Sequence, residues 1–251
     1  MTGQEWLGAI LVYSLALWVV LSGLDDLFLQ SAYVWLRFRG VRALREPSER
    51  ELARVRQKRI AVLVPMWHED GVARHMLEHN LAAVRYAAWD FFVGVYPNDP
   101  RTAEAVEAVA ARFANVHLAM CPHPGPTSKA DCLNWIYREM AGYESRGGER
   151  FEAVVIHDAE DLIHPESLRL INYYLENYDM VQVPVLPLAT PPGEFTHGLY
   201  CDEFAEYQSK DIPVRQYLGG FIASNGVGTG FSREVLEALR ENGGRIFDPD
   251  S

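Results

Sequence analysis

The chain has 251 residues, of which 49% are hydrophobic and 12% aromatic, so it can build a full hydrophobic core and is not a disordered protein. The formal net charge of -11 is uneven, because residues 1–59 carry 9 Lys/Arg against 6 Asp/Glu whereas residues 60–251 carry 14 against 28. An acidic main portion excludes nucleic acid as the expected partner, since phosphate backbones bind basic surfaces.

The segment from Trp6 to Leu24 contains no charged residue and predicts a transmembrane helix. Its 19 residues would span about 28 Å at about 1.5 Å per residue, close to the roughly 30 Å apolar core of a bilayer. A buried hairpin helix is the alternative. A cleaved signal peptide is not expected, because the first six residues carry Glu5 and no basic residue.

A second, amphipathic helix is predicted over residues 27–38, lying on the membrane surface with Tyr33 and Trp35 as interfacial anchors. Residues 37–59 then carry nine Lys/Arg and three Asp/Glu. Under the positive-inside bias this basic linker predicts a cytoplasmic location for everything that follows. Residues 1–59 are therefore interpreted as a membrane anchor.

After residue 59 the pattern alternates between strands and helices. Five apolar, β-branched runs predict strands: Ile60–Val64, Phe91–Tyr96, Val116–Met120, Val154–Ile156 and Met180–Val185. Helical stretches lie between them: Val72–Val84, Ala103–Phe113, Lys129–Met140 and Pro165–Asn177. This rhythm predicts one α/β domain over residues 60–251, with a mostly parallel sheet, helices on both faces and right-handed crossovers.

Three carboxylates follow the fourth predicted strand within four residues: Asp158, Glu160 and Asp161. Two unit charges about 4 Å apart interact by roughly 4 kcal/mol at an effective dielectric constant of about 20, so such a cluster repels itself. A divalent cation would relieve the repulsion, and Mg²⁺ or Mn²⁺ binds carboxylates together with substrate phosphates. The alternative is a helix N-terminal cap, in which the negative charge of Asp161 stabilises the positive end of the dipole of the helix predicted from Pro165.

Polar residues also follow the first two predicted strands, at Val64–Glu69 and Tyr96–Pro100. Thr127, Ser128 and Lys129 stand at the start of a predicted helix, where free backbone N–H groups and the dipole favour phosphate. The spacing of a Walker A loop is absent. Because parallel strands end at one edge of a sheet, these polar segments should meet there.

Three motifs occur in a fixed order: Val-Pro-x-x-x-Glu at 64–69, Lys-Ala-x-x-Leu-Asn at 129–134 and Asp-Ala-Glu-Asp at 158–161. In this order they resemble a family-2 glycosyltransferase with the GT-A nucleotide-sugar fold. The segments Leu218–Gly220, Gly228–Arg233 and Phe247–Pro249 resemble the acceptor side of that family. The resemblance covers residues 58–251.

The resemblance implies a donor-binding role for five residues: Pro65, Glu69, Asp99, Lys129 and Asp158. The first three would line the nucleoside pocket, Lys129 would approach the diphosphate, and Asp158 would lie on the ribose side. It also implies a Mg²⁺ or Mn²⁺ ion held by Glu160, with Asp161 as the second candidate ligand. On the acceptor side it implies Asp202, Glu203, Gly228, Thr229 and Arg233, although a solvated helix face explains Asp202 and Glu203 equally well.

Two positions depart from the family pattern. His68 stands where the family usually has Asn, and Asn98 replaces the first acid of an Asp-Asp pair. The uracil pocket is therefore expected to be similar to that of the family and not identical.

The function that the resemblance implies is inverting, metal-dependent transfer of a sugar from a UDP-sugar to a cell-surface glycan or lipid-linked acceptor. The implied location is the bacterial inner membrane, with a single span, a cytoplasmic catalytic domain and an outer-membrane export partner. The family's catalytic base is the Asp of a Thr-Glu-Asp motif after a Phe-Asp-Pro segment, here Phe247–Pro249. We expect that base beyond Ser251, so that the chain is C-terminally incomplete and weakly active or inactive; general-base help is worth roughly 100- to 10,000-fold.

Two other functions stay open from the sequence. One is a donor-binding or scaffold module without turnover, which the missing base and Asn98 favour. The other is a zinc metallopeptidase, because His75, Glu78 and His79 match His-x-x-Glu-His, although a third ligand is unmarked. The three cysteines show no Cys-x-x-Cys spacing and predict a reducing compartment without disulfides.

Overall fold

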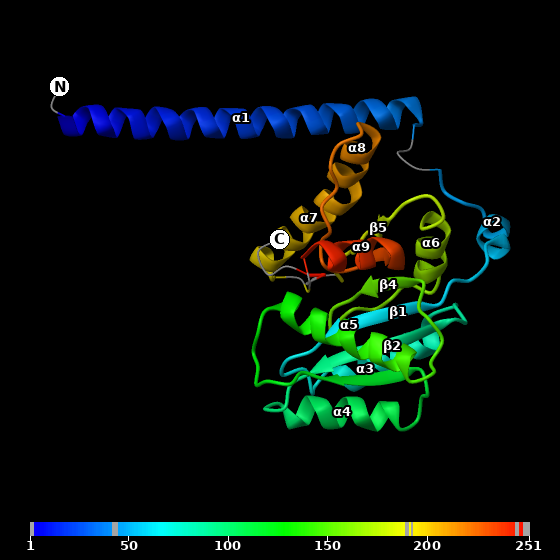
Figure 1. Cartoon of the computed structure of the whole chain (residues 1–251). Coiled ribbons are helices and arrows are strands. Elements are labelled where there is room, and N and C mark those ends of the chain that lie inside the picture. The colour runs from blue at the N-terminus through cyan, green and yellow to red at the C-terminus, as the bar shows by residue number, and fades with distance from the viewer. Residues whose placement is uncertain (1–2, 42–44, 189–190, 192, 244–245, 248–251) are drawn as a thin grey trace. The chain divides into compact units, whose positions relative to one another are not determined.

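The computed structural model describes residues 3–41, 45–188, 191, 193–243 and 246–247 (Figure 1). The chain divides into two compact units, one made of Met1–Glu46 with Pro184–Ala223 and the other of Pro47–Val183 with Ser224–Ser251. We call them the helical unit and the sheet unit. Residues 184–223 fall within the helical unit, so the sheet unit is formed by two separate stretches of the chain, and the domain bounds expected from the sequence stay a prediction.

The sheet unit is a mixed sheet flanked by helices. Its strands are β1 Ile60–Pro65, β2 Trp89–Val95, β3 Val116–Met120, β4 Ala153–Ile156, β5 Met180–Gln182 and β6 Thr229–Ser232. Its helices are α2 Glu49–Arg54, α3 Ala73–Ala83, α4 Pro100–Ala110, α5 Lys129–Ser145, α6 Ser167–Tyr174 and α9 Arg233–Gly243. The strand order is β3-β2-β1-β4-β6-β5; β1 to β4 are parallel, and β6 runs antiparallel between β4 and β5.

Helices cover both faces of this sheet, as Figure 1 shows for α3 and α4 on one side and α5 on the other. Along β1, Val62 and Val64 belong to the core shared with α3, α4 and α6, whereas Ala61 and Leu63 belong to the core shared with α5 and α9. Alternate residues of a strand point to opposite faces, so a strand between two helical layers is apolar throughout. Each fully buried Val or Leu contributes roughly 1.5–3 kcal/mol.

The predicted α/β class with helices on both faces is confirmed, and so are the first four strands. The start of α5 at Lys129 also matches, because the Ser128 hydroxyl accepts the backbone N–H of Asp131 at 3.1 Å and caps the helix. Neither β6 nor α9 was predicted. The four residues Thr-Gly-Phe-Ser of β6 are too short to show a period of two, and their pairing with β4 comes from tertiary contact.

The helical unit contains α1 Gly3–Arg39, α7 Phe195–Glu206, the π-helical turn η1 Tyr207–Asp211 and α8 Ile212–Tyr217. One continuous helix of 37 residues replaces the two helices predicted over 6–24 and 27–38. No proline separates the two segments, so the helical hydrogen bonds run through Asp25 and Asp26 without a break.

The second half of α1 also differs from a helix lying freely on a membrane. Leu29 and Leu36 are buried in a small core with Val214 of α8, and Arg215 of α8 approaches Asp25 at 3.4 Å. The first half, in contrast, exposes large apolar side chains throughout. Among the described residues one helix, Trp6–Arg39, is long and apolar enough to cross a membrane, with a mean hydropathy of 2.2 over its best window.

Candidate functional site

The loops that follow β1, β2 and β4 lie at one edge of the sheet unit. Pro65, the half-buried last residue of β1, pairs with Gly94 of β2, and Leu63 pairs with Ile156, the last residue of β4. The carboxyl ends of parallel strands are where open α/β sheets bind ligands. We call this region, from which the predicted donor and metal residues of the sheet unit emerge, the carboxyl edge.

Asp99 links the loops after β1 and β2. Its buried carboxylate caps α4 by accepting the backbone N–H of Thr102 at 3.5 Å, and it accepts the backbone N–H of His68 at 2.7 Å. His68 adopts a left-handed backbone with φ of 58°, and the N–H of Glu69 donates to the Thr102 hydroxyl at 3.0 Å. Burial opposes ionisation of Asp99, but the hydrogen bonds from Thr102 and His68 outweigh it and keep its pKa below the ordinary value.

Glu69 lies in a field of negative charge. Partial burial, followed by repulsion from Glu160 and then from Asp99, raises the pKa of its carboxyl above the ordinary value. The charges of Glu160, after β4, and of Asp99, after β2, thus both act on Glu69, after β1. A cation beside Glu69 would be attracted by all three.

Asn98 has a structural role that explains why an amide stands at this position in place of the acid of the family pattern. Its side-chain N–H donates to the carbonyl of Gly125 at 2.7 Å, and its side-chain oxygen accepts the N–H of the same residue at 2.8 Å. A carboxylate could accept but not donate, so only an amide completes both bonds. Nearby, the Tyr96 hydroxyl contacts the Thr127 hydroxyl at 2.7 Å, and a Cβ on Gly125 would lie 2.7 Å from the Tyr96 ring. The loop that leads into α5 is thus closely packed against the end of β2.

Lys129, the first residue of α5, reaches across the carboxyl edge. Its ammonium forms an ion pair with Asp158 after β4 and donates to the carbonyl of Gly226 at 2.8 Å. Both partners leave the lysine about 40% exposed, so it remains accessible to a ligand. The structure therefore brings Lys129 and Asp158 together, as expected for two residues that contact one diphosphate donor.

Asp161 and Glu160 differ in their surroundings. One carboxylate oxygen of Asp161 accepts the backbone N–H of Asp158 at 2.9 Å and contacts Nδ1 of His157 at 2.8 Å, so Asp161 closes the turn after β4. The Glu160 side chain is exposed. This difference favours Glu160 over Asp161 as the residue that meets a metal ion.

The turn is also held by Asn80 of α3, which the sequence analysis did not single out. Its buried side chain donates to the carbonyl of Asp161 and accepts the N–H of Ile163, both at 2.8 Å. A lone asparagine within an amphipathic helix carries no sequence signal for this role, because its partners lie 81 and 83 residues away.

These side chains could supply part of the coordination shell of a divalent cation, but not all of it. Within the residues that the structure describes, no group of three or more His, Cys, Asp or Glu side chains could hold a metal by itself. Mg²⁺ and Mn²⁺ commonly need only one or two carboxylates, because water and substrate phosphates complete their octahedral shell. Glu160 could supply such a carboxylate to an ion that arrives with a diphosphate.

The predicted acceptor residues of the sheet unit are mostly engaged inside the protein. Gly228 bonds to the carbonyl of Ile156 at 2.8 Å, and Thr229 is fully buried at the start of β6. Arg233 is 4% exposed and donates to both carboxylate oxygens of Glu144, at 3.0 and 2.9 Å. These contacts favour a role for Arg233 in packing α9 against α5 rather than in binding an acceptor.

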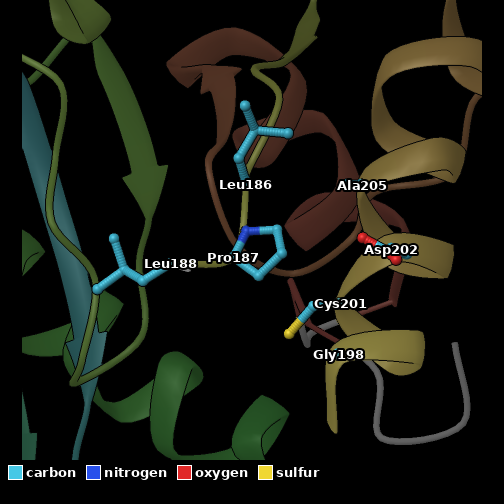
Figure 2. A pocket seen from close by; sticks show the side chains of 7 residues that line it. All are labelled: Leu186, Pro187, Leu188, Gly198, Cys201, Asp202 and Ala205. Carbon is cyan, nitrogen blue, oxygen red and sulfur yellow. The ribbon is translucent and has the colours of Figure 1, made fainter. Parts of the chain in front are cut away.

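Asp202 and Glu203 lie on α7 of the helical unit and are exposed. Asp202 lines an open pocket of about 430 Å³ together with six other residues: Leu186, Pro187, Leu188, Gly198, Cys201 and Ala205 (Figure 2). Figure 2 shows the carboxylate of Asp202 among largely apolar neighbours. Their assignment to the acceptor stays a prediction.

The proposed zinc motif on α3 has a different explanation. His75 and His79 are exposed, and Glu78 forms ion pairs with Arg74 and Arg112, whose hydrogen bonds lower its pKa. Together with the absence of a metal cluster among the described residues, these pairs make Glu78 a surface ion-pair partner of α3 and α4.

Asn134 of α5 carries a second contact that the sequence analysis did not predict. Its side-chain oxygen accepts the N–H groups of Ile246 and Phe247 at 3.1 and 3.2 Å, and its amide donates to the carbonyl of Phe247 at 2.7 Å. Ile246 and Phe247, the first residue of the Phe-Asp-Pro motif, are therefore anchored to the helix that begins with Lys129. Asp248 and Asp250 lie outside the described residues, and the base expected beyond Ser251 stays a prediction.

Comparisons with known proteins agree with this geometry. Residues 57–250 match the family model described as glycosyltransferase like family 2. Bacteriophage adsorption protein B from two strains of Escherichia coli is 42% identical to the chain over 254 residues, which cover 98% of the chain and 34% of each relative. The chain thus spans about a third of the length of these curated relatives.

Among solved structures, a mannosyltransferase from Pyrobaculum calidifontis in complex with GDP-Man and Mn²⁺ superposes with a TM-score of 0.52. It is 21% identical and the match covers 90% of this chain and 56% of the other, a likeness that shows the fold. With the family model spanning the whole sheet unit except its first residues, the chain belongs to glycosyltransferase-like family 2 and adopts the GT-A fold.

Proposed function

We propose that the chain is the donor-binding part of a membrane-anchored, inverting glycosyltransferase that uses a nucleoside diphosphate sugar, a UDP-sugar in the first instance. The observation that carries this proposal is the meeting of Lys129 with Asp158, beside Glu160 and Glu69, at the carboxyl edge. A lysine supplies positive charge to a diphosphate, and the surplus of acids supplies ligands to the Mg²⁺ or Mn²⁺ that accompanies it.

The roles that we propose are those that the family resemblance implies. Pro65, Glu69 and Asp99 form the nucleoside side of the site, and Lys129 and Asp158 form the diphosphate and ribose side. Glu160 is the proposed metal ligand, and the bound cation would neutralise charge on the leaving diphosphate. The likeness to a mannosyltransferase that binds GDP-Man with Mn²⁺ supports a metal-dependent nucleotide site and makes GDP the second nucleotide to test.

The proposed acceptor is a cell-surface glycan or a lipid-linked precursor, reached from the cytoplasmic face of a bacterial inner membrane. Support comes from the long apolar helix within α1 and from the basic residues that follow it. The relatives, named for bacteriophage adsorption, are consistent with a product exposed at the cell surface and with an outer-membrane export partner.

Calorimetric titration of the detergent-solubilised chain with UDP and GDP, with Mn²⁺ or with EDTA, tests the proposal. We expect one nucleotide to bind at least about tenfold more tightly with Mn²⁺, because one ligand carboxylate on a cation contributes on the order of 1.5–3 kcal/mol. Glu160→Gln should remove most of that difference, whereas Glu107→Gln, an exposed acid on α4, should leave it unchanged. Absence of nucleotide binding under both conditions would refute the proposal.

Release of UDP from UDP-sugars separates an enzyme from a donor-binding module. Metal-dependent binding with release supports the transferase, and binding without release supports a module that lacks turnover. Loss of a general base alone would slow transfer by about 100- to 10,000-fold.

A further inference from the structure

Gln182, the last residue of the edge strand β5, makes an unusually complete set of side-chain hydrogen bonds. Its oxygen accepts the Asn225 N–H at 3.0 Å and the Thr229 hydroxyl at 2.7 Å. Its amide donates to the carbonyls of Val183 and Val227, both at 2.9 Å. A side-chain amide has two donors and one oxygen with two lone pairs, so all of its capacity is used here.

Three of these partners, Asn225, Val227 and Thr229, lie in one tight turn, residues 224–229, which leads into β6. Within it the Ser224 hydroxyl donates to the Thr229 hydroxyl at 3.0 Å and accepts the N–H of Gly226 at 3.2 Å. Gly226 and Gly228 have φ angles of 69° and 62°, which residues with a Cβ rarely adopt. Side-chain bonds from Gln182, Ser224 and Thr229 therefore stabilise a turn that its backbone alone would not favour.

This turn contacts Lys129 of the proposed diphosphate site through a backbone carbonyl. The Gly226 carbonyl accepts a hydrogen bond from Lys129 at 2.8 Å, and Lys129 also pairs with Asp158. A lysine ammonium has three N–H donors, so two have protein partners and one is left. Because the three donors have fixed tetrahedral directions, the position of the Gly226 carbonyl determines where the remaining N–H points.

We propose that Gln182 is a positioning residue for the donor diphosphate: it places the Gly226 carbonyl, which in turn directs the third N–H of Lys129 at the phosphate oxygens. The inference rests on the proposed function and deepens it, because it assigns a role to an edge strand that contacts no donor residue directly. Gln182 is proposed to act through Gly226 and Lys129, without contacting the donor itself.

A residue that only stabilises β5 would behave differently from one that directs Lys129. Replacing a residue that only stabilises β5 would lower the free energy of unfolding and lower the affinity for every ligand alike. Replacing a residue that directs Lys129 would lower the affinity for ligands that carry a diphosphate and leave the affinity for the bare nucleoside unchanged. Its effect would also disappear once Lys129 is replaced, because residues that act through one group are coupled.

The experiment compares UDP with uridine by calorimetric titration of the detergent-solubilised chain in Mn²⁺. We expect Lys129→Met to lower the affinity for UDP about tenfold or more, because a charge-assisted hydrogen bond is lost. We expect Gln182→Met to lower the affinity for UDP about three- to tenfold. Both variants should bind uridine within about twofold of the parent, and the double variant should bind UDP no more weakly than Lys129→Met alone.

Asn172→Leu is the control, because Asn172 is also a side-chain amide that makes two bonds to the backbone: it is 2% exposed, accepts the Lys58 N–H at 3.2 Å and donates to the Arg56 carbonyl at 3.0 Å. It should lower stability and leave the ratio of UDP to uridine affinity unchanged. Thr229→Val removes one bond to Gln182 with little change of shape, and it should shift the ratio in the same direction by about twofold even if Gln182→Met folds poorly.

Three results would overturn the inference: equal weakening of UDP and uridine by Gln182→Met, additive effects in the double variant, or an unchanged affinity ratio in both Gln182→Met and Thr229→Val. If Lys129→Met lowers the affinity for UDP while the Gln182 variants do not, the inference fails and the proposed function stands. If the parent chain binds neither UDP nor GDP, the proposed function fails and the inference fails with it.

Discussion

The two ends of the parallel strands carry charged residues with opposite consequences. At the amino ends, before β1 and on β2, Arg59 pairs with Asp90 at 3.0 Å and with Glu149 at 2.7 Å, and His117 contacts Asp90 at 2.8 Å. At the carboxyl edge the acids outnumber the cations, since Lys129 pairs with Asp158 whereas Glu69 is close enough to Glu160 and Asp99 to be repelled by them. Charges that are matched within the protein support the fold, whereas charges left in surplus need a partner from outside.

The electrostatic response of single groups reflects this difference. Partial burial, together with repulsion from Glu160 and Asp99, raises the pKa of Glu69 at the carboxyl edge. At the amino ends, burial lowers the pKa of the Arg59 guanidinium, but attraction to Asp90 and the hydrogen bonds to Glu149 and Asp90 together outweigh burial and raise that pKa, which stabilises the charged form. The comparison predicts that variants at the amino ends change stability and that variants at the carboxyl edge change ligand binding.

The largest expected effect is on stability, at the amino ends. Arg59→Met should lower the free energy of unfolding by about 3 kcal/mol, because it leaves the buried carboxylate of Asp90 without its charge partner. Urea unfolding followed by circular dichroism measures this change. Arg101→Met, at an exposed arginine of α4, is the control and should change stability by no more than about 0.5 kcal/mol. Loss of UDP binding by folded Arg59→Met would contradict the comparison.

The next effect separates two neighbours at the carboxyl edge. Glu160→Gln should reduce the Mn²⁺-dependent gain in UDP affinity about tenfold and leave stability nearly unchanged, whereas Asp161→Asn should lower stability by about 1 kcal/mol and reduce the gain much less. The reason is that Asp161 closes the turn through Asp158 and His157, while Glu160 is exposed. The opposite pattern would make Asp161 the metal ligand.

A smaller effect is expected at Asn98. Asn98→Asp loses the donor to the Gly125 carbonyl and adds an acid to an acidic edge, so we expect a stability loss of about 1 kcal/mol and UDP affinity lower by about two- to fivefold without metal. Asn115→Asp is the matched control at the amino ends, where the amide donates to the Trp89 carbonyl at 3.4 Å. It should change stability without changing UDP affinity, and an effect on UDP would show that the two ends are not independent.

The smallest effect concerns pH. The folded state raises the pKa of Glu69, so its neutral form is favoured and the protein loses stability as pH rises from the ordinary glutamate pKa through the raised one. Glu69→Gln removes this loss. We expect a gain of up to about 0.5 kcal/mol above that window and none below it, together with weaker nucleoside binding. Thermal unfolding across acidic to neutral pH measures the gain, and a gain that persists below the window would have another cause.

Much of the fold and of the site could be read from local patterns. The apolar runs of β1 to β4, the helices between them and the cap at Ser128 are each encoded within a few residues, so their positions were predictable from the sequence. The order of the polar segments at strand ends also placed Lys129 and Asp158 on one edge before any contact was known, because parallel strands end together.

Other features depend on contacts between residues far apart in the sequence. Asn98 was noted only as the replacement of an acid in the family pattern, whereas the structure shows its amide bonded to Gly125 across 27 residues. Arg233 was assigned to the acceptor, yet it pairs with Glu144 across 89 residues. A polar residue type shows that a partner is needed, but not which one.

By itself the sequence determined the α/β class, the family and the edge where the chemistry gathers, because short-range periodicity and motif order encode them. Only the tertiary structure decided that β6 inserts between β4 and β5, that α1 continues through Asp25, and that Glu160 rather than Asp161 is left exposed. Each of these outcomes depends on which distant groups satisfy a backbone hydrogen bond or a buried charge, and that choice is made by packing in three dimensions.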